Sequence, residues 1–172
     1  MDLSLETIDV WEIQGDLPPR DFLPAIAQLL SPGDIAMFGC YEPTPELEMA
    51  LAEAGASRHD HLEGFFMCFY ANRSEHPNGC AFRYTIHGKP FEDILRLSDA
   101  ILSQKDIPSF YDHFVAYRPG IPQLPLISFH DAAYGGTLYL SGHYTEEHAR
   151  TAARSLSREA VQITNPILSQ QK

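Results

Sequence analysis

The sequence predicts a single α+β domain in which a mixed sheet of about six strands carries helices mainly on one side. Two observations lead to this prediction. The first half of the chain alternates strand-like with helix-like segments, which implies a sheet covered by helices. The last third holds three short strand-like segments, "YDHFVAYR", "LISFHDA" and "TLYLSG", separated by turn-forming residues. Such an order is typical of an antiparallel meander, and a ferredoxin-like variant fits it.

The N-terminal segments follow one another in a strand–helix–strand order. Residues 5–15, "LETIDVWEIQG", favour a strand and end at the turn sequence "GDLPPR". Residues 21–30 predict a helix, because their large apolar side chains recur at helical spacing. Residues 34–41, "DIAMFGCY", are apolar at successive positions, which is the pattern of a central strand buried on both faces.

The next helix has the clearest boundaries in the chain. Thr44 is suited to the N-cap, Pro45 to the first helical position and Gly55 to the stop. Its apolar positions form one stripe on the predicted helix: Leu47, Ala50, Leu51 and Ala54. We therefore expect Leu51 to lie in the core.

The middle of the chain contains one ambiguous segment. Residues 64–72 are apolar without a clear period, so they are compatible with a strand or a buried helix.

Residues 80–88 alternate apolar with polar side chains and predict a half-buried strand. A helix is predicted from about residue 91 to 102. After the meander, Thr145 caps a last helix; we expect the domain to span residues 1–162 and residues 163–172 to fray.

Composition restricts the class of protein. Twelve basic residues stand against 23 acidic ones, giving a net charge of −11. Such a chain repels nucleic acid. The negative charge is explained by solubility alone or, as the alternative interpretation, by a protein partner with a basic surface. We expect no membrane span, no signal peptide and no disulfide framework, since the apolar runs are short, the N-terminus is acidic and the three cysteines lack paired spacing. The chain is therefore expected to be cytoplasmic.

The segment "ISFHDAAYGGTLYLSGHYTEEHAR", residues 127–150, suggests a metal site at first sight. His143 lies five positions before His148 and precedes the helix, so the two cannot share a helix face as the H-x-x-E-H motif requires. Glu146 and Glu147 are explained by the positive end of the helix dipole. We expect no metal and no cofactor.

Five residues are candidates for acid–base chemistry: Asp112, His113, His130, Asp131 and His143. If the first two strands of the meander pair antiparallel, Asp112 or His113 comes close to His130 or Asp131. Such a pair could orient an imidazole as a general base, or could simply close the end of the sheet by a hydrogen bond. We favour the structural role, and we expect all five residues to gather at one end of the sheet.

The C-terminal order resembles that of a group of small bacterial α+β proteins of unassigned function. The likeness covers Pro32 to about Leu156 and rests on "PGDIAMFGCYEPTPELEMALAEAG", "YDHFVAYRPG", "SFHDAAYGGTLYLSG" and "TEEHAR". The connection "GIPQLPL" is longer than the pattern of the group, which puts the strand register in doubt. The resemblance implies a fold and no activity.

Three functional hypotheses follow. The leading one is a non-enzymatic binding protein, monomeric or homodimeric, that neutralises or regulates a basic partner; by analogy, small acidic toxin-immunity proteins are similar in composition. The second is a small hydrolase or metal-dependent enzyme that uses the histidines and aspartates above. The third is a structural subunit of a homo-oligomer, for which the aromatic content supplies interface material. No nucleophile elbow, phosphate loop or paired-cysteine motif supports an enzyme.

Overall fold

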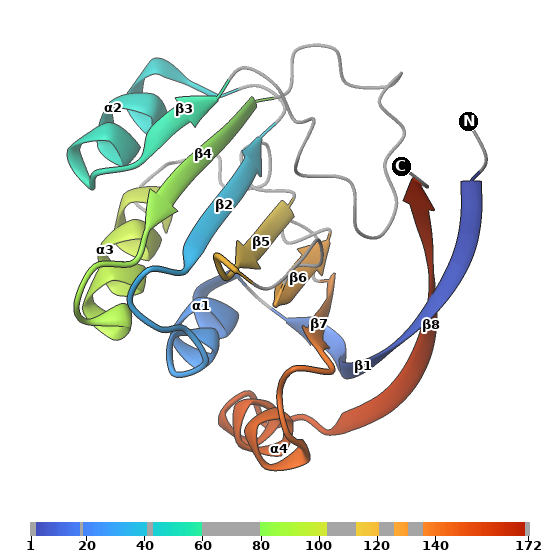
Figure 1. Ribbon diagram of the computed structural model, residues 1–172. Helices are drawn as coiled ribbons and strands as arrows, with labels where there is room; N and C mark the ends of the chain where they lie inside the picture. The colour runs from blue at the N-terminus through green and yellow to red at the C-terminus, as the bar shows by residue number, and fades with distance from the viewer. Residues whose placement is uncertain are drawn as a thin grey trace.

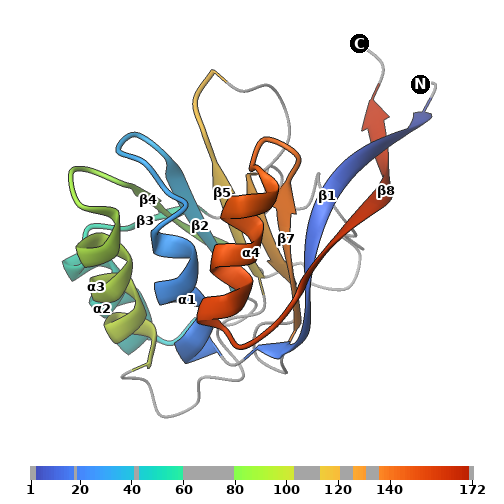
Figure 2. The same ribbon diagram turned by 90° about the horizontal axis from the view of Figure 1, so that it is seen from below.

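The computed structural model describes residues 3–17, 19–40, 43–59, 80–102, 113–120, 126–130 and 136–170. Within these ranges, one eight-stranded sheet has the order β3-β4-β2-β5-β6-β7-β1-β8. Every neighbouring pair of strands is antiparallel. The four helices lie on one face of this sheet, as Figures 1 and 2 show.

The elements alternate along the chain as follows. The strands are β1 (Leu3–Leu17), β2 (Ile35–Cys40), β3 (Ser57–His59), β4 (Cys80–Thr85), β5 (His113–Tyr117), β6 (Ile127–His130), β7 (Gly136–Ser141) and β8 (Ala160–Gln170). The helices are α1 (Pro19–Ala27), α2 (Pro45–Glu53), α3 (Pro90–Leu102) and α4 (Glu146–Ser155).

The α+β class is confirmed, and the eight strands of the described sheet match the predicted size of about six only approximately. The predicted mixture of parallel and antiparallel strands is wrong, because every described pair is antiparallel. The two additional strands lie at its edges: β3 has only three residues, and β8 begins at Ala160. Edge strands need no continuous apolar run because they are solvated along one side, which explains why their sequences did not suggest strands.

The C-terminal segment differs from the expected frayed tail. Residues 160–170 pair with β1 in one unbroken register, from Ile13↔Ala160 to Leu3↔Gln170. "TNPILSQ" contains a proline and several polar residues, so its strand character depends on a partner at the other end of the chain. Local pattern therefore could not reveal it.

Other predicted elements are confirmed. Strands β5, β6 and β7 are consecutive neighbours in the sheet, as a meander requires, and α4 follows them. Thr44 is the N-cap of α2, with its side chain accepting from the backbone N–H of Leu47 at 3.2 Å. Gly55 ends this helix at φ +95°, a conformation that L side chains rarely adopt. Residues 64–72 lie outside the described residues.

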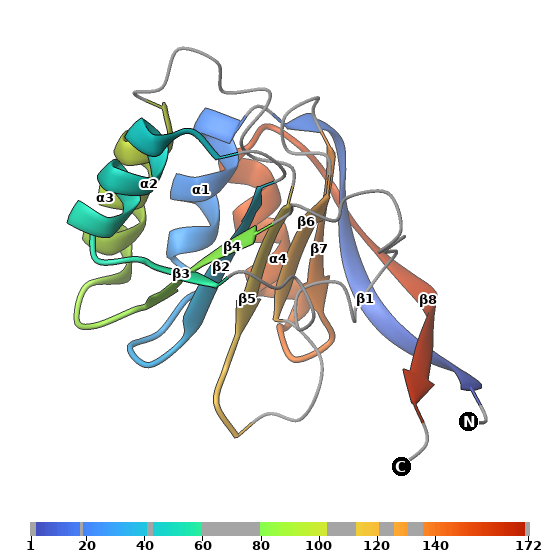
Figure 3. The ribbon, with the colours of Figure 1, turned by 90° about the horizontal axis from the view of Figure 1, so that it is seen from above.

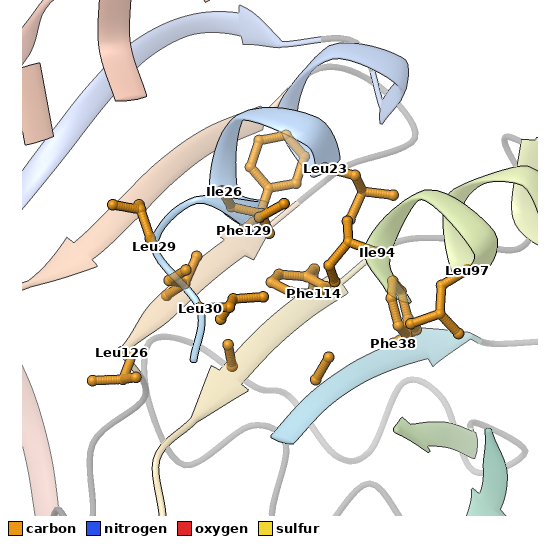
Figure 4. Close-up of a cluster of buried hydrophobic side chains, with 14 of the residues drawn as sticks. Leu23, Ile26, Leu29, Leu30, Phe38, Ile94, Leu97, Phe114, Leu126 and Phe129 are labelled. Carbon is orange, nitrogen blue, oxygen red and sulfur yellow. The ribbon is translucent and has the colours of Figure 1, made fainter. Parts of the chain in front are cut away.

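The main core lies between the helices and the sheet. Phe38 of β2 and Phe114 of β5 meet edge to face at the centre, with ring centroids 5.2 Å apart. Figure 4 shows a group of aliphatic side chains packed around them, which come from α1, from the residues just after α1 and from α3: Leu23, Ile26, Leu29, Leu30, Ile94 and Leu97. Leu51, on the predicted stripe of α2, belongs to the same core and is 1 % exposed.

Candidate functional site

Two polar clusters lie at one end of the sheet, where β2 begins and where β4, β5 and β7 end. Ile35 of β2 is opposite Thr85 of β4 and Tyr117 of β5, so the residues just beyond these three strands are neighbours. Backbone hydrogen bonds extend this end of the sheet to β7, because Leu126 N–H donates to Ala116 and Ser141 N–H donates to Leu126. The first group, the Asp34 cluster, consists of Ser31, Asp34, Arg118 and His143. The second, the Asp93 cluster, consists of Tyr84, His87, Asp93 and Arg96.

The Asp34 carboxylate is the buried centre of the first cluster, at 1 % exposed. Arg118 donates from Nε to Oδ1 and from Nη2 to Oδ2, each at 2.8 Å. The backbone N–H of Ser31 donates to Oδ2, also at 2.8 Å. This fork-shaped pairing compensates a charge that burial alone would make very costly.

Arg118 extends the cluster toward solvent. Its hydrogen bond to Asp34 raises the pKa of the guanidinium, although partial burial acts in the opposite direction. Nη2 also donates to the Ser31 hydroxyl at 3.3 Å, and Nη1 lies 3.1 Å from His143 Nε2. Because a guanidinium has no acceptor, the His143 Nε2 atom is the acceptor of this bond, which favours the tautomer with the proton on Nδ1.

The turn from β7 into α4 brings His143 to this position. Gly142 allows the turn to approach β1 closely, since a Cβ there would lie 2.8 Å from the Asp9 carbonyl oxygen. Tyr144 anchors the other side of the turn: its buried hydroxyl donates to the Leu29 carbonyl at 2.9 Å. Trp11 Nε1 donates to the Tyr144 carbonyl at 3.0 Å. Burial raises the pKa of the Tyr144 phenol well above its usual range.

The chemistry open to the Asp34 cluster is therefore limited. Asp34 is neutralised by a bidentate cation, and Tyr144 is a buried donor that keeps its proton. The cluster joins the α1–β2 turn, the end of β5 and the β7–α4 turn, which are far apart in sequence. We infer a structural role for this cluster. The buried ion pair between Asp34 and Arg118 holds these three segments together at one end of the sheet.

The Asp93 cluster fixes α3 against the end of β4. Asp93 Oδ2 accepts the backbone N–H of His87 at 2.9 Å, and Oδ1 accepts Arg96 Nη2 at 2.8 Å. The same Nη2 donates to the Tyr84 hydroxyl at 2.6 Å. Burial by itself would raise the pKa of Asp93, but the bonds from His87 and Tyr84 and the charge of Arg96 together lower it. Burial, followed by the hydrogen bond to Asp93, raises the pKa of Tyr84.

The candidates predicted from the sequence are only partly brought together. His113 and His130 are direct partners in the antiparallel register of β5 and β6, which confirms the predicted pairing of these strands. Asp112 and Asp131 lie outside the described residues. The expectation that all five candidates share one end of the sheet is wrong, because His143 is at the opposite end, beside Arg118.

Strand direction explains the position of His143. Strand β7 runs antiparallel to β6, so Leu140 near its C-terminal end is opposite Ile127 at the beginning of β6. His130 is at the far end of β6, near the start of β7. In a meander, consecutive strands end at opposite ends of the sheet. The number of residues between two histidines does not reveal at which end each of them lies.

His148 takes part in capping the helix α4. Its backbone N–H donates to Thr145 Oγ1 at 3.3 Å, and its ring Nδ1 accepts the backbone N–H of Thr145 at 3.4 Å. Thr145 is thus the predicted cap, with His148 completing a capping box. Among the residues described, no group of three or more His, Cys, Asp or Glu side chains is placed to hold a metal ion.

Sequence reasoning missed the residues that form the two clusters, chiefly Asp34, Arg118 and Asp93. A signal for the first pair was present: Asp34 opens the apolar segment 34–41, and Arg118 ends the segment 111–118. Opposite charges at the ends of two antiparallel neighbours can meet. That signal is informative only once β2 and β5 are known to be adjacent.

Comparisons with known proteins found no matching family model, no matching curated protein and no matching solved structure. The helices in the described part of the chain are all too short or too polar to cross a membrane.

Proposed function

We propose that this protein is a non-enzymatic binding protein that recognises a partner with a basic surface through the solvent side of α2 and α3. The observation that carries the proposal is that each of these two helices exposes large apolar side chains with carboxylates about one turn away along the same helix. Met49 on α2 is 60 % exposed, and Phe91 and Leu95 on α3 are 57 % and 42 % exposed. Phenylalanine and methionine are enriched in protein interfaces.

Helical spacing arranges these residues into two stripes. Glu46, Met49 and Glu53 recur at intervals of three and four along α2. On α3, the positions of Phe91, Leu95 and Asp99 recur at intervals of four. We call these six residues the α2–α3 face. The two helices pack beside each other on the same side of the sheet.

The charges of this face favour a basic partner. Glu48 forms an ion pair with Arg58, and Glu92 with Lys89. Glu46, Glu53 and Asp99 are exposed and, within the described residues, have no cationic partner. Carboxylates at the rim of an apolar patch attract lysine and arginine during the encounter, while the apolar side chains supply the buried contact.

The Asp93 cluster gives this face a rigid support. Asp93 fastens the first turn of α3 to the backbone at His87, between the positions of Phe91 and Leu95. A side chain on an immobilised helix loses less conformational entropy on binding than one on a mobile loop. The network therefore supports a binding role for α3.

Affinity capture with matched variants tests the proposal. The wild type and the variant Met49→Ser/Phe91→Ser/Leu95→Ser serve as baits in extracts of the native host. Val161→Ser is the control, since Val161 is an exposed apolar residue on β8, 43 % exposed and outside this face. We expect a partner of positive net charge that binds the wild type and the control but not the triple variant.

The contribution of charge is tested on the captured partner. Glu46→Gln/Glu53→Gln should slow association about tenfold at low salt, while the control Glu147→Gln/Glu159→Gln, with the same charge change elsewhere, should have a small effect. Added salt should remove the difference between the two double variants. A partner that is itself acidic, or that binds every variant equally, would contradict the proposal.

A further inference from the structure

Strands β1 and β8 continue beyond the rest of the sheet as a two-stranded arm. Strand β1 pairs with β7 only from Val10 to Leu17, whereas its pairing with β8 extends back to Leu3. Residues 3–9 and their partners 164–170 form this β1–β8 arm. Figures 1 and 3 show it projecting away from the helices and the other strands, with both chain ends at its tip. An isolated two-stranded ribbon is marginally stable in water.

The position of Pro166 indicates which backbone groups of the arm point outward. In a regular antiparallel ladder, alternate residues direct both N–H and C=O toward the partner strand, and the others direct them away. Proline has no N–H, so Pro166 belongs to the outward set, together with its register partner Thr7. Because the direction alternates along the strand, the backbone N–H and C=O groups of Leu3 and Leu5 on β1 also point away from β8.

The two edges of the arm differ in how well they could accept another strand. The β8 edge is interrupted by Pro166, which removes one donor. The β1 edge, at residues 3–7, contains neither proline nor lysine, which are the residues that commonly protect exposed edges. No other described strand lies along residues 3–9 on that side. The β1 edge is therefore the one able to accept a further strand.

We propose that the β1 edge pairs antiparallel with the same edge of a second copy of this chain, so that two arms form a continuous four-stranded sheet. A strand that pairs with its own copy satisfies two-fold symmetry without any further sequence requirement. With the axis at Leu5, the outward residues match one another: Leu5 is opposite Leu5, and Leu3 is opposite Thr7 twice, once on each side of the axis. These three pairs provide about six backbone hydrogen bonds between the chains.

Charge also permits this register. Glu6 is opposite Ser4 of the second copy, and Asp9 lies beyond the paired outward residues, so no carboxylates face each other. Like charges directly opposite would destabilise the pairing. The partner of this surface is thus another copy of the chain, which is independent of the binding role proposed for the α2–α3 face.

Sedimentation of the intact protein over about 1–200 µM tests the inference, because a dimer dissociates on dilution. We expect the wild type to reach twice the 19.3 kDa mass of one chain. Leu5→Lys should remain monomeric, since it brings two cations together at the axis. Leu168→Lys is the matched control, because Leu168 is the register partner of Leu5 on β8 and the substitution adds the same charge to the other edge. This control should still dimerise.

Amide hydrogen exchange of the wild type provides a readout that does not depend on a variant folding. The N–H groups of Leu3, Leu5 and Thr7 should gain protection as the concentration rises, whereas those of Ser4 and Glu6, which already face β8 in the single chain, should gain less. A wild type that stays monomeric, a Leu5→Lys protein that dimerises normally, or protection that does not change with concentration would each overturn the inference. Equal loss of dimer in both lysine variants would overturn the assignment to the β1 edge.

Discussion

Asp34 and Arg118 are separated by 84 positions in the chain, yet their side chains form two parallel hydrogen bonds of 2.8 Å at one end of the sheet. The carboxylate is buried, and the guanidinium is the group that neutralises it. Strands β2 and β5 are neighbours in the interior of the sheet, and the ion pair links the start of β2 to the end of β5. The stability of the α1–β2 and β7–α4 turns therefore depends on this interaction.

Replacing Arg118 with Met should lower the free energy of unfolding by about 3–5 kcal/mol, because Asp34 is then a buried charge without a partner. Urea denaturation measures the change. Arg154→Met is the control, since Arg154 is exposed and bonds only within α4, and it should have little effect. Adding Asp34→Asn to Arg118→Met should restore part of the loss. An unchanged midpoint for Arg118→Met would show that water reaches and solvates Asp34.

Features with local signals could be predicted from the sequence. The cap at Thr44, the stop at Gly55 and the buried strand β2 each depend on a few adjacent residues, and each is found where the sequence places it. The meander is also local, because short connections force its strands to be neighbours. For that reason the approach of His113 to His130 could be predicted, whereas the position of His143, the third candidate among the described residues, required the direction of each strand.

Non-local features could not be predicted in the same way. Strand β8 is defined by its pairing with β1 at the other end of the chain, and the sequence of β8 has weak strand character by itself. The Asp34–Arg118 pair depends on the strand order, which places β5 beside β2 although α2, β3, β4 and α3 intervene along the chain. Charged residues at strand ends are common, so the pair is not recognisable before the topology is known.

Replacing Leu51 with Ala should lower the free energy of unfolding by about 2–5 kcal/mol, since its side chain is fully enclosed by the core and its removal leaves a cavity. Met49→Ala, on the solvent side of the same helix, is the control and should change stability by less than about 0.5 kcal/mol. Chemical denaturation of both variants compares them directly. Equal effects would mean that α2 is rotated from the orientation described.

Asp93 should make stability depend on acidity below about pH 4, near the ordinary pKa of an aspartate. Its pKa is lowered in the folded protein, so as the pH falls the unfolded chain takes up the proton first. The stabilisation is complete above the unfolded pKa and is lost as the pH falls through the folded value. Asp93→Asn removes this contribution, so the stability difference between wild type and variant should shrink as the pH is lowered from 6 to 3. A stability difference between the two proteins that stays constant over this pH range would contradict the prediction.

His143 should be protonated at Nδ1 and not at Nε2 in its neutral form, because Nε2 accepts a hydrogen bond from Arg118. Nitrogen chemical shifts of the imidazole ring, measured above pH 8, distinguish the two tautomers. In Arg118→Met the constraint is absent, and the tautomer population should change. The opposite tautomer in the wild type would mean that the ring is turned away from the guanidinium.

The protein should contain no stoichiometric transition metal. A structural or catalytic zinc site requires at least three protein ligands held at about 2.0–2.3 Å by surrounding hydrogen bonds. With His143 at the other end of the sheet, the pair His113 and His130 supplies two imidazoles, and a third ligand would have to come from outside the described residues. Elemental analysis of protein purified without a histidine tag should therefore find well below one metal ion per chain, and His113→Ala and His130→Ala should leave that content unchanged. Zinc, manganese or iron at one equivalent, lost in either variant, would contradict this prediction and favour the metal-dependent enzyme over the binding protein.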